Sequence, residues 1–115
     1  MDLDVLRQRL EAFASDREWD QFHSTRNLLL ALVGEVGEVS ELLQWVDDDG
    51  IHEFLSSGGR ERLGEELADV LIYVVRLADK SGVHLSAAIE AKLESNAVKY
   101  PVERSKGSAK KYNET

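Results

Sequence analysis

The chain has 115 residues, 43% of them hydrophobic and 31% charged, a composition that predicts one compact globular domain and excludes a fibrous or low-complexity protein. The absence of cysteine excludes disulfides, thiolate zinc sites and a cysteine nucleophile, and it favours a reducing, cytoplasmic location. A net charge of −8 opposes nucleic-acid binding. Acidic residues near the N-terminus are unlike a signal peptide, and no apolar run approaches the roughly 20 residues that a membrane span requires.

Hydrophobic periodicity predicts four helices and no strand. The helices are expected over about residues 3 to 16, 25 to 46, 60 to 80 and 85 to 99. Ser24 or Thr25 offers an N-cap for the second helix, and the stretch between the second and third helices, rich in serine and glycine, is expected to be a loop. The fourth helix ends before Pro101, because proline disfavours helical geometry in the preceding residue. We therefore expect an all-α fold that resembles a four-helix bundle.

Two pairs of carboxylates share one register on the second and third predicted helices. At about 100° per residue, Glu35 borders the apolar arc of its helix and Glu38 lies about 60° further toward solvent. Glu66 and Asp69 repeat this relation on the next helix, so packing of the two arcs brings all four to one edge of the seam. Oxygen ligands without Cys or His favour Mg²⁺ or Mn²⁺ there. A single pair of this kind also occurs on ordinary solvated helix faces.

Aromatic and amide side chains near these carboxylates suit a nucleotide. Trp45 lies seven residues beyond the second carboxylate, about 10 Å along the helix and roughly the span from a triphosphate to its base. Trp19 and His23 precede the second helix, where a ring can stack on a nucleobase. Asn96 and Tyr100, at the end of the fourth helix, can read a base edge. Each of these residues also fits a structural role in core packing, at the surface or in helix capping.

Charge divides the chain into an acidic body and a basic tail. Residues 1–91 hold 8 basic and 19 acidic side chains, whereas residues 92–115 hold 6 basic and 3 acidic ones. We expect residues 1–100 to form the helical domain that carries the carboxylates. Residues 101–115 are expected to be a basic tail of the same domain, extended or mobile, that Tyr112 can pin to the body. A solvated terminus is the alternative. The residues that can contact phosphates are Lys92, Lys99, Arg104, Lys106, Lys110 and Lys111.

A series of segments resembles the MazG-like all-α nucleoside triphosphate pyrophosphohydrolases, and the branch with the greatest similarity is the dCTP pyrophosphatases. The first segment is QFHSTRNLLLALVGEVGE from Gln21 to Glu38, followed by Leu42-x-Gln44-Trp45. The later segments are Glu65-Glu66-Leu67-x-Asp69-Val70-Leu71-Ile72-Tyr73, Lys92-Leu93-x-x-Asn96-x-x-x-Tyr100-Pro101 and Gly107-Ser108-Ala109-x-Lys111-Tyr112. The match covers about residues 19 to 112, except that the stretch from Asp47 to Arg60 does not match closely.

The resemblance implies an enzyme that hydrolyses dCTP or a modified dCTP to the monophosphate and pyrophosphate, by water attack on the α-phosphorus. It implies Mg²⁺, with Mn²⁺ as the alternative, held by Glu35, Glu38, Glu66 and Asp69. Glu38 is our choice for the general base because its angular position is the more open. The implied base pocket comprises Trp19, His23, Trp45, Tyr73, Asn96 and Tyr100, with Lys92 and Lys99 near the phosphates. The resemblance also implies a homo-oligomer, typically a tetramer whose active sites draw on neighbouring chains.

Two other functions stay open at this point. The same chemistry can act on dUTP or on a damaged purine nucleotide, because a stacking pocket tolerates many bases. The chain can also be a non-catalytic helical oligomerisation module whose carboxylates are surface charge. No nucleic-acid or membrane partner is expected in either case.

Overall fold

The computed structural model describes residues 1–109, which belong to two compact units that divide after Val83. The helices are α1 (Leu3–Asp16), α2 (Thr25–Leu43), α3 (Ile51–Phe54), α4 (Arg60–Lys80), α5 (Leu85–Lys99) and α6 (Val102–Ser105). Short helical turns η1 (Asp20–Phe22), η2 (Asp48–Gly50) and η3 (Leu55–Gly59) join them. No strand occurs within residues 1–109, which confirms the all-α prediction. None of these helices combines the length and the apolar character that crossing a membrane requires.

The long helices begin and end where their capping chemistry dictates. The side chain of Ser24 accepts a hydrogen bond from the Asn27 N–H at 3.0 Å, which fixes the start of α2 as predicted. α2 ends at Leu43, three residues before the predicted end, because the Val46 N–H bonds to the Leu43 carbonyl in a tighter turn. The predicted bounds of α1, α4 and α5 are confirmed.

The stretch between α2 and α4, predicted to be a loop, is largely helical. Ile51, Phe54 and Leu55 are half-buried, so this segment has apolar side chains to cover despite its serines and glycines. Gly58 has φ = 91°, a conformation that breaks the helical path just before α4. Gly59 packs against Phe54 so closely that an added Cβ would lie 2.2 Å from the Phe54 carbonyl oxygen. Two consecutive glycines therefore allow a sharp turn rather than a flexible loop.

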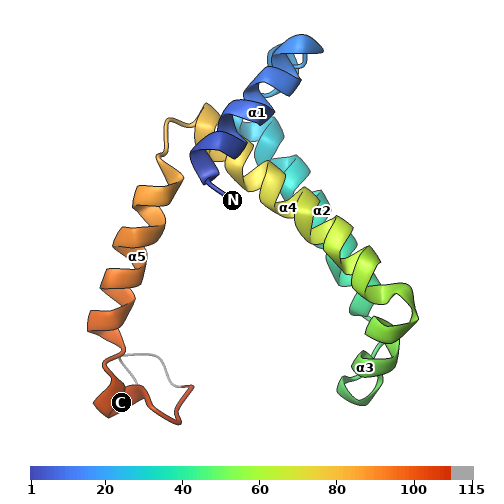
Figure 1. The fold of residues 1–115 in the computed structure, drawn as a ribbon, viewed down its shortest axis with the longest axis vertical. Coiled ribbons are helices and arrows are strands. Elements are labelled where there is room, and N and C mark those ends of the chain that lie inside the picture. The colour runs from blue at the N-terminus through green and yellow to red at the C-terminus, as the bar shows by residue number, and fades with distance from the viewer. Residues whose placement is uncertain (110–115) are drawn as a thin grey trace. The chain divides into compact units, whose positions relative to one another are not determined.

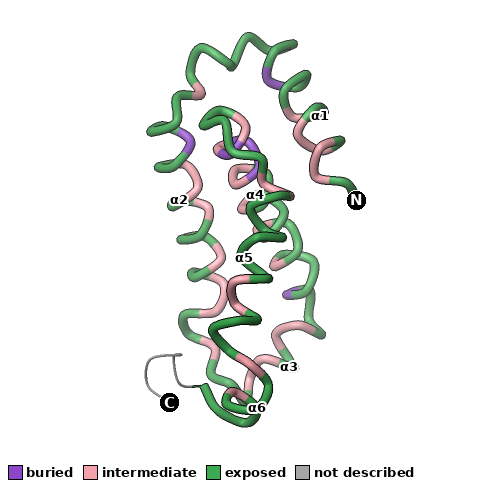
Figure 2. The backbone as a smooth tube through the Cα atoms, turned by 90° about the vertical axis from the view of Figure 1, so that its left-hand side faces the viewer, coloured by how far each residue is buried: buried purple, intermediate pink, exposed green. Residues whose placement is uncertain are grey.

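The first unit, Met1–Val83, is built on the pair α2 and α4, which lie side by side (Figure 1). α1 packs on α4, and the buried apolar side chains among the described residues, Ala14, Leu28, Val75 and Ala78, all come from these three helices. Figure 2 shows that much of α2 and α4 is instead exposed or only half-buried. The large apolar side chains left open on these two helices include Leu29, Leu30, Val33, Val36, Leu67 and Leu71.

The second unit begins at His84. His84 caps α5, because its Nδ1 accepts a hydrogen bond from the Ala87 N–H at 3.2 Å. At the other end, the Tyr100 N–H donates to the Asn96 carbonyl at 2.8 Å, and Pro101 starts the short helix α6. The prediction of an extended tail is therefore wrong for residues 102–105, where proline at the N-cap favours one helical turn. Lys110, Lys111 and Tyr112 lie outside the described residues.

Candidate active site

α2 and α4 bring three of the four predicted carboxylates together. Glu35, Glu38 and Glu66 each offer one oxygen, and these oxygens lie within 4.8 Å of one another. Glu35 and Glu66 are half-buried and Glu38 is exposed. We call these three residues the acidic cluster. The shared register of the two helices explains this geometry. Residues three apart lie on the same side of a helix, so the packing of α2 against α4 brings the carboxylates to one edge of the helix contact.

Two oxygens of the acidic cluster lack a partner in the described part of the chain. Oε2 of Glu35 and Oε2 of Glu66 are buried and accept no hydrogen bond there. Buried polar atoms are nearly always satisfied, because an unsatisfied one loses its interaction with water without replacement. Oxygen-only donors with unused lone pairs are the ligands that a hard divalent cation such as Mg²⁺ takes. The residues present therefore fit a divalent metal ion.

The charges of the acidic cluster act on one another strongly. Burial raises the pKa of Glu35, and the charges of Glu38 and Asp69 raise it further. The pKa of Glu66 is raised first by the close approach of the Glu38 carboxyl group, then by burial and by the charges of the neighbouring carboxylates. These carboxylates are thus costly to ionise together, and a cation among them would remove that cost.

Asp69, the fourth predicted ligand, is exposed on α4 and is not one of the three residues whose oxygens converge. Its charge nevertheless acts on both Glu35 and Glu66, as the raised pKa values of these residues record. Asp69 follows Glu66 by three residues, so it lies on the neighbouring side of the same helix. The structure thus places Asp69 beside the acidic cluster.

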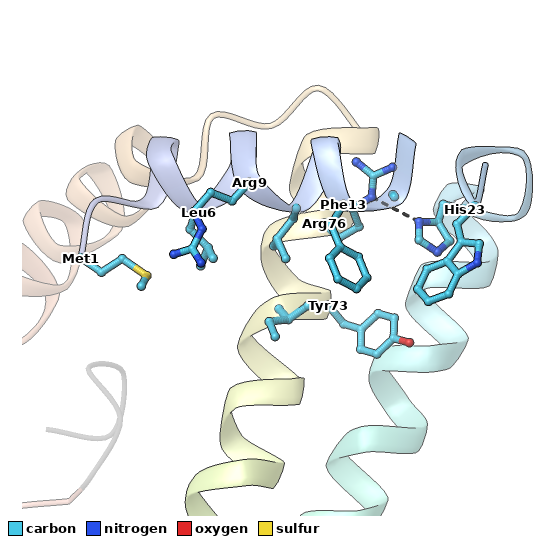
Figure 3. Close-up of a pocket in the computed structure, with 11 residues that line it drawn as sticks. Met1, Leu6, Arg9, Phe13, His23, Tyr73 and Arg76 are labelled. Carbon is cyan, nitrogen blue, oxygen red and sulfur yellow. Dashed lines mark hydrogen bonds between the residues drawn. The ribbon is translucent and has the colours of Figure 1, made fainter. Parts of the chain in front are cut away.

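An aromatic pocket of about 500 Å³ lies between α1, α4 and the η1 turn. Figure 3 shows Phe13 and Tyr73 facing the same space, with His23 at one end and Met1 at the other. Trp19 meets Phe13 edge-to-face, with ring centroids 5.7 Å apart, and meets His23 in the same manner at 6.4 Å. Flat rings around an apolar space are suited to holding a nucleobase. The residues that line this pocket include Leu6, Leu10, Phe13, Trp19, His23 and Tyr73.

The η1 turn is held in place by hydrogen bonds from α2 and α4. The side-chain amide of Asn27 donates to the Phe22 carbonyl at 3.1 Å. Arg76 of α4 contacts both Asp20 and His23 of the turn, and Lys80 donates to Asp20 at 3.3 Å. The Lys80 hydrogen bond lowers the pKa of Asp20, and Arg76 acts in the same direction. Two cations from one helix therefore anchor the turn that carries the pocket's histidine.

The other predicted base and phosphate contacts belong to other elements of the chain. Trp45 lies in the turn after α2, with 89% of its surface exposed, and is not among the residues that line the aromatic pocket. The remaining residues belong to the second unit, at the C-terminal half of α5 and just beyond it. These are Lys92, Asn96, Lys99 and Tyr100.

Sequence reasoning missed Arg76 and the α1 side of the pocket. Helix geometry could have indicated Arg76, because at about 100° per residue Arg76 lies within roughly 60° of Tyr73 and therefore on the same side of α4 as this predicted pocket residue. The α1 residues repeat at helical spacing, which marks a buried face but does not tell a pocket wall from a core. Contacts across more than 50 residues, such as that between Arg76 and His23, have no local pattern.

Comparison with known proteins identifies the family of the chain. A model of the MazG-like family matches residues 31–115. The chain belongs to the MazG-like family, which confirms the resemblance carried by its motifs.

Relatives with known names support a hydrolase of nucleotides. The dCTP pyrophosphatase 1 of Bos taurus is 48% identical over 113 residues, which are 97% of this chain and 67% of the relative. That of Homo sapiens is 46% identical over 97% of this chain and 66% of its own length. The chain thus spans about two thirds of these relatives. A crystal structure of a pyrophosphatase from Archaeoglobus fulgidus superposes with a TM-score of 0.78 at 34% identity, over 85% of this chain and 91% of that one.

Proposed function

We propose that the chain is a divalent-metal-dependent pyrophosphohydrolase that converts dCTP, or a modified dCTP, to the monophosphate and pyrophosphate. The observation that carries this proposal is the acidic cluster, with two buried oxygens that accept no hydrogen bond from the described residues. The names of the relatives support the choice of dCTP. Tyr73 follows Glu66 by seven residues on α4, so pocket and cluster are about 10 Å apart along the helix, which suits a base and its triphosphate.

In this mechanism Glu35, Glu38, Glu66 and Asp69 would hold the metal, the first three as the acidic cluster and Asp69 from beside it. Mg²⁺, or Mn²⁺ in its place, supplies positive charge for the phosphates and lowers the pKa of an attacking water when it is bound. The exposed carboxylate of Glu38 is the base that takes the proton of that water. A new bond forms between the water oxygen and the α-phosphorus, and the bond to the bridging oxygen breaks, which releases pyrophosphate.

The aromatic pocket binds the base by stacking. Trp19, His23 and Tyr73 supply the rings, and the apolar side chains of α1 exclude water from them. The further contacts in this proposal are base contacts by Trp45, Asn96 and Tyr100 and phosphate contacts by Lys92 and Lys99.

The active enzyme in this proposal is a homo-oligomer, a tetramer, located in the cytoplasm. The apolar side chains open on α2 and α4 support assembly, because exposed patches of this kind mark interaction surfaces. A second copy of the same chain is the occupant that fits, since few side chains of a single copy are fully buried. The lack of cysteine supports a reducing compartment.

Pyrophosphate release across a panel of nucleotides, with and without Mg²⁺, tests the function directly. We expect hydrolysis that depends on Mg²⁺ and prefers dCTP. A highest rate with dUTP or a damaged purine nucleotide would identify a different substrate for the same reaction. No release with any nucleotide would favour a non-catalytic helical module.

A further inference from the structure

Arg76 is a buried charge at the edge of the aromatic pocket, with only 4% of its surface exposed. Its Nε donates a hydrogen bond to Nδ1 of His23 at 3.2 Å, drawn as the dashed line in Figure 3. Nη2 donates to the Asp20 carboxylate, and Nη1 donates to Asp79 at 3.4 Å. The guanidinium group is therefore fixed by partners on two elements and leaves its Nε–H for the histidine.

The charge of Arg76 is balanced by carboxylates that other cations also contact. Lys80 donates to Asp20 at 3.3 Å, and Arg7 of α1 lies 3.6 Å from Asp79. A guanidinium group carries only N–H donors and no hydrogen-bond acceptor. The group that accepts from it must therefore present a lone pair.

This requirement sets the protonation state of His23. Nδ1 accepts the hydrogen bond from Arg76, so it carries no proton, and the ring hydrogen resides on Nε2. Burial lowers the pKa of His23, and the Arg76 charge lowers it further, while Asp20 opposes this shift and Lys80 supports it. Among residues 1–109, no hydrogen bond engages Nε2. The ring thus keeps one unused donor at the pocket.

We propose that Arg76 is a positioning residue that holds His23 as the neutral Nε2–H tautomer, so that this wall of the pocket offers a hydrogen-bond donor and no acceptor. The ligand group that fits is an acceptor, such as a carbonyl oxygen or an unprotonated ring nitrogen of a pyrimidine base. An amino group at the same place does not fit, because two donors would meet. This inference rests on the proposed binding of a nucleotide base in the pocket.

The tautomer itself can be observed in the protein without any nucleotide. Long-range ¹H–¹⁵N correlation spectra distinguish the Nε2–H from the Nδ1–H form, and His23→Phe identifies the signals that belong to His23. We expect the Nε2–H pattern in the wild-type protein and a mixture of tautomers in Arg76→Met. Lys80→Met is the matched control, since Lys80 also contacts Asp20 but is not bonded to His23. An Nδ1–H or doubly protonated ring in the wild-type protein at neutral pH would overturn the proposal.

A double-mutant cycle then tests whether Arg76 acts through His23. Losing one hydrogen bond to the base predicts a KM raised on the order of fivefold in Arg76→Met, with kcat within about twofold of the wild-type value. In a His23→Phe background, Arg76→Met should change KM by less than about twofold. The same factor in both backgrounds would show a merely structural role for Arg76. Absence of hydrolysis by the wild-type protein would refute the proposed function, while the spectra would still decide the tautomer.

Discussion

Glu35 carries a buried oxygen whose partner the described residues do not supply, and this makes it the most direct probe of metal binding. Glu35→Gln removes one of the mutually repelling charges, so we expect the metal-free variant to unfold at a higher temperature than the wild-type protein. Mg²⁺ at about 100 times its Kd should stabilise the wild-type protein by about 2.7 kcal/mol and the variant by far less. Thermal unfolding with and without Mg²⁺ measures both effects.

Glu41→Gln is the matched control for this experiment, because Glu41 is exposed on the same helix and lies outside the acidic cluster. It should behave like the wild-type protein. If Glu35→Gln kept the full response to Mg²⁺, Glu35 would not be a ligand.

Glu38 is the exposed member of the acidic cluster and the proposed base. We expect Glu38→Gln to lower kcat by about 10² to 10⁴, because the amide cannot take a proton from water. Its exposure predicts little change in the unfolding temperature. Steady-state hydrolysis of dCTP gives the rate, and Glu65→Gln, an exposed change on α4, should leave it unaltered. A wild-type kcat in the Glu38→Gln enzyme would show that another group is the general base.

His23 links the pocket to the pH dependence of stability. Its pKa is lowered in the folded state by burial and by Arg76, so on acidification the unfolded chain takes up its proton first. The contribution of His23 to stability is therefore complete above its unfolded pKa of about 6.5 and declines as the pH falls below it. We expect the free energy of unfolding to drop more between pH 7.5 and pH 5.5 in the wild-type protein than in His23→Phe. Urea unfolding at the two pH values tests this, and equal drops would show that His23 is not perturbed.

At the scale of elements, the turn before α4 depends on Gly58, whose φ of 91° disfavours any side chain. Gly58→Ala should lower the free energy of unfolding by about 1 to 2 kcal/mol. Gly64→Ala is the converse change within α4, where a Cβ meets no atom within 4 Å among the described residues. It should raise stability by up to about 1 kcal/mol, because alanine favours a helix over glycine. Urea unfolding of both variants measures these changes in the free energy of unfolding. An increase in Gly58→Ala would contradict the positive φ of Gly58.

Helices were predictable from the sequence where local patterns determine them. The apolar spacing and the Ser24 cap gave the bounds of the long helices to within three residues, and the shared register gave the convergence of Glu35, Glu38 and Glu66. Helices α3 and α6 were missed, because each has only four residues and the serines and glycines after α3 and the proline before α6 also suit a loop. The contact of Arg76 with His23 depends on how distant segments pack, and no local spacing encodes it.

At the scale of the whole molecule, the apolar faces of α2 and α4 predict assembly. Val33 is 60% exposed, so Val33→Glu should dissociate the proposed oligomer by placing a charge in its interface. Sedimentation velocity measures the state, and Ser40→Glu, which adds the same charge at an exposed polar position on α2, should leave it intact. A wild-type protein that sediments as a monomer at every concentration would refute the oligomer.

Within residues 1–109, few side chains are fully buried in a single copy. If copies complete one another's hydrophobic core, folding and association are one equilibrium, and the unfolding midpoint rises with protein concentration. A defective copy expressed beside a sound one would then enter shared particles. In such mixed oligomers the sound copies would restore the fold of the defective copy, or the defective copy would destabilise the sound ones. A mutation in one allele would therefore change the activity of oligomers that also contain wild-type copies.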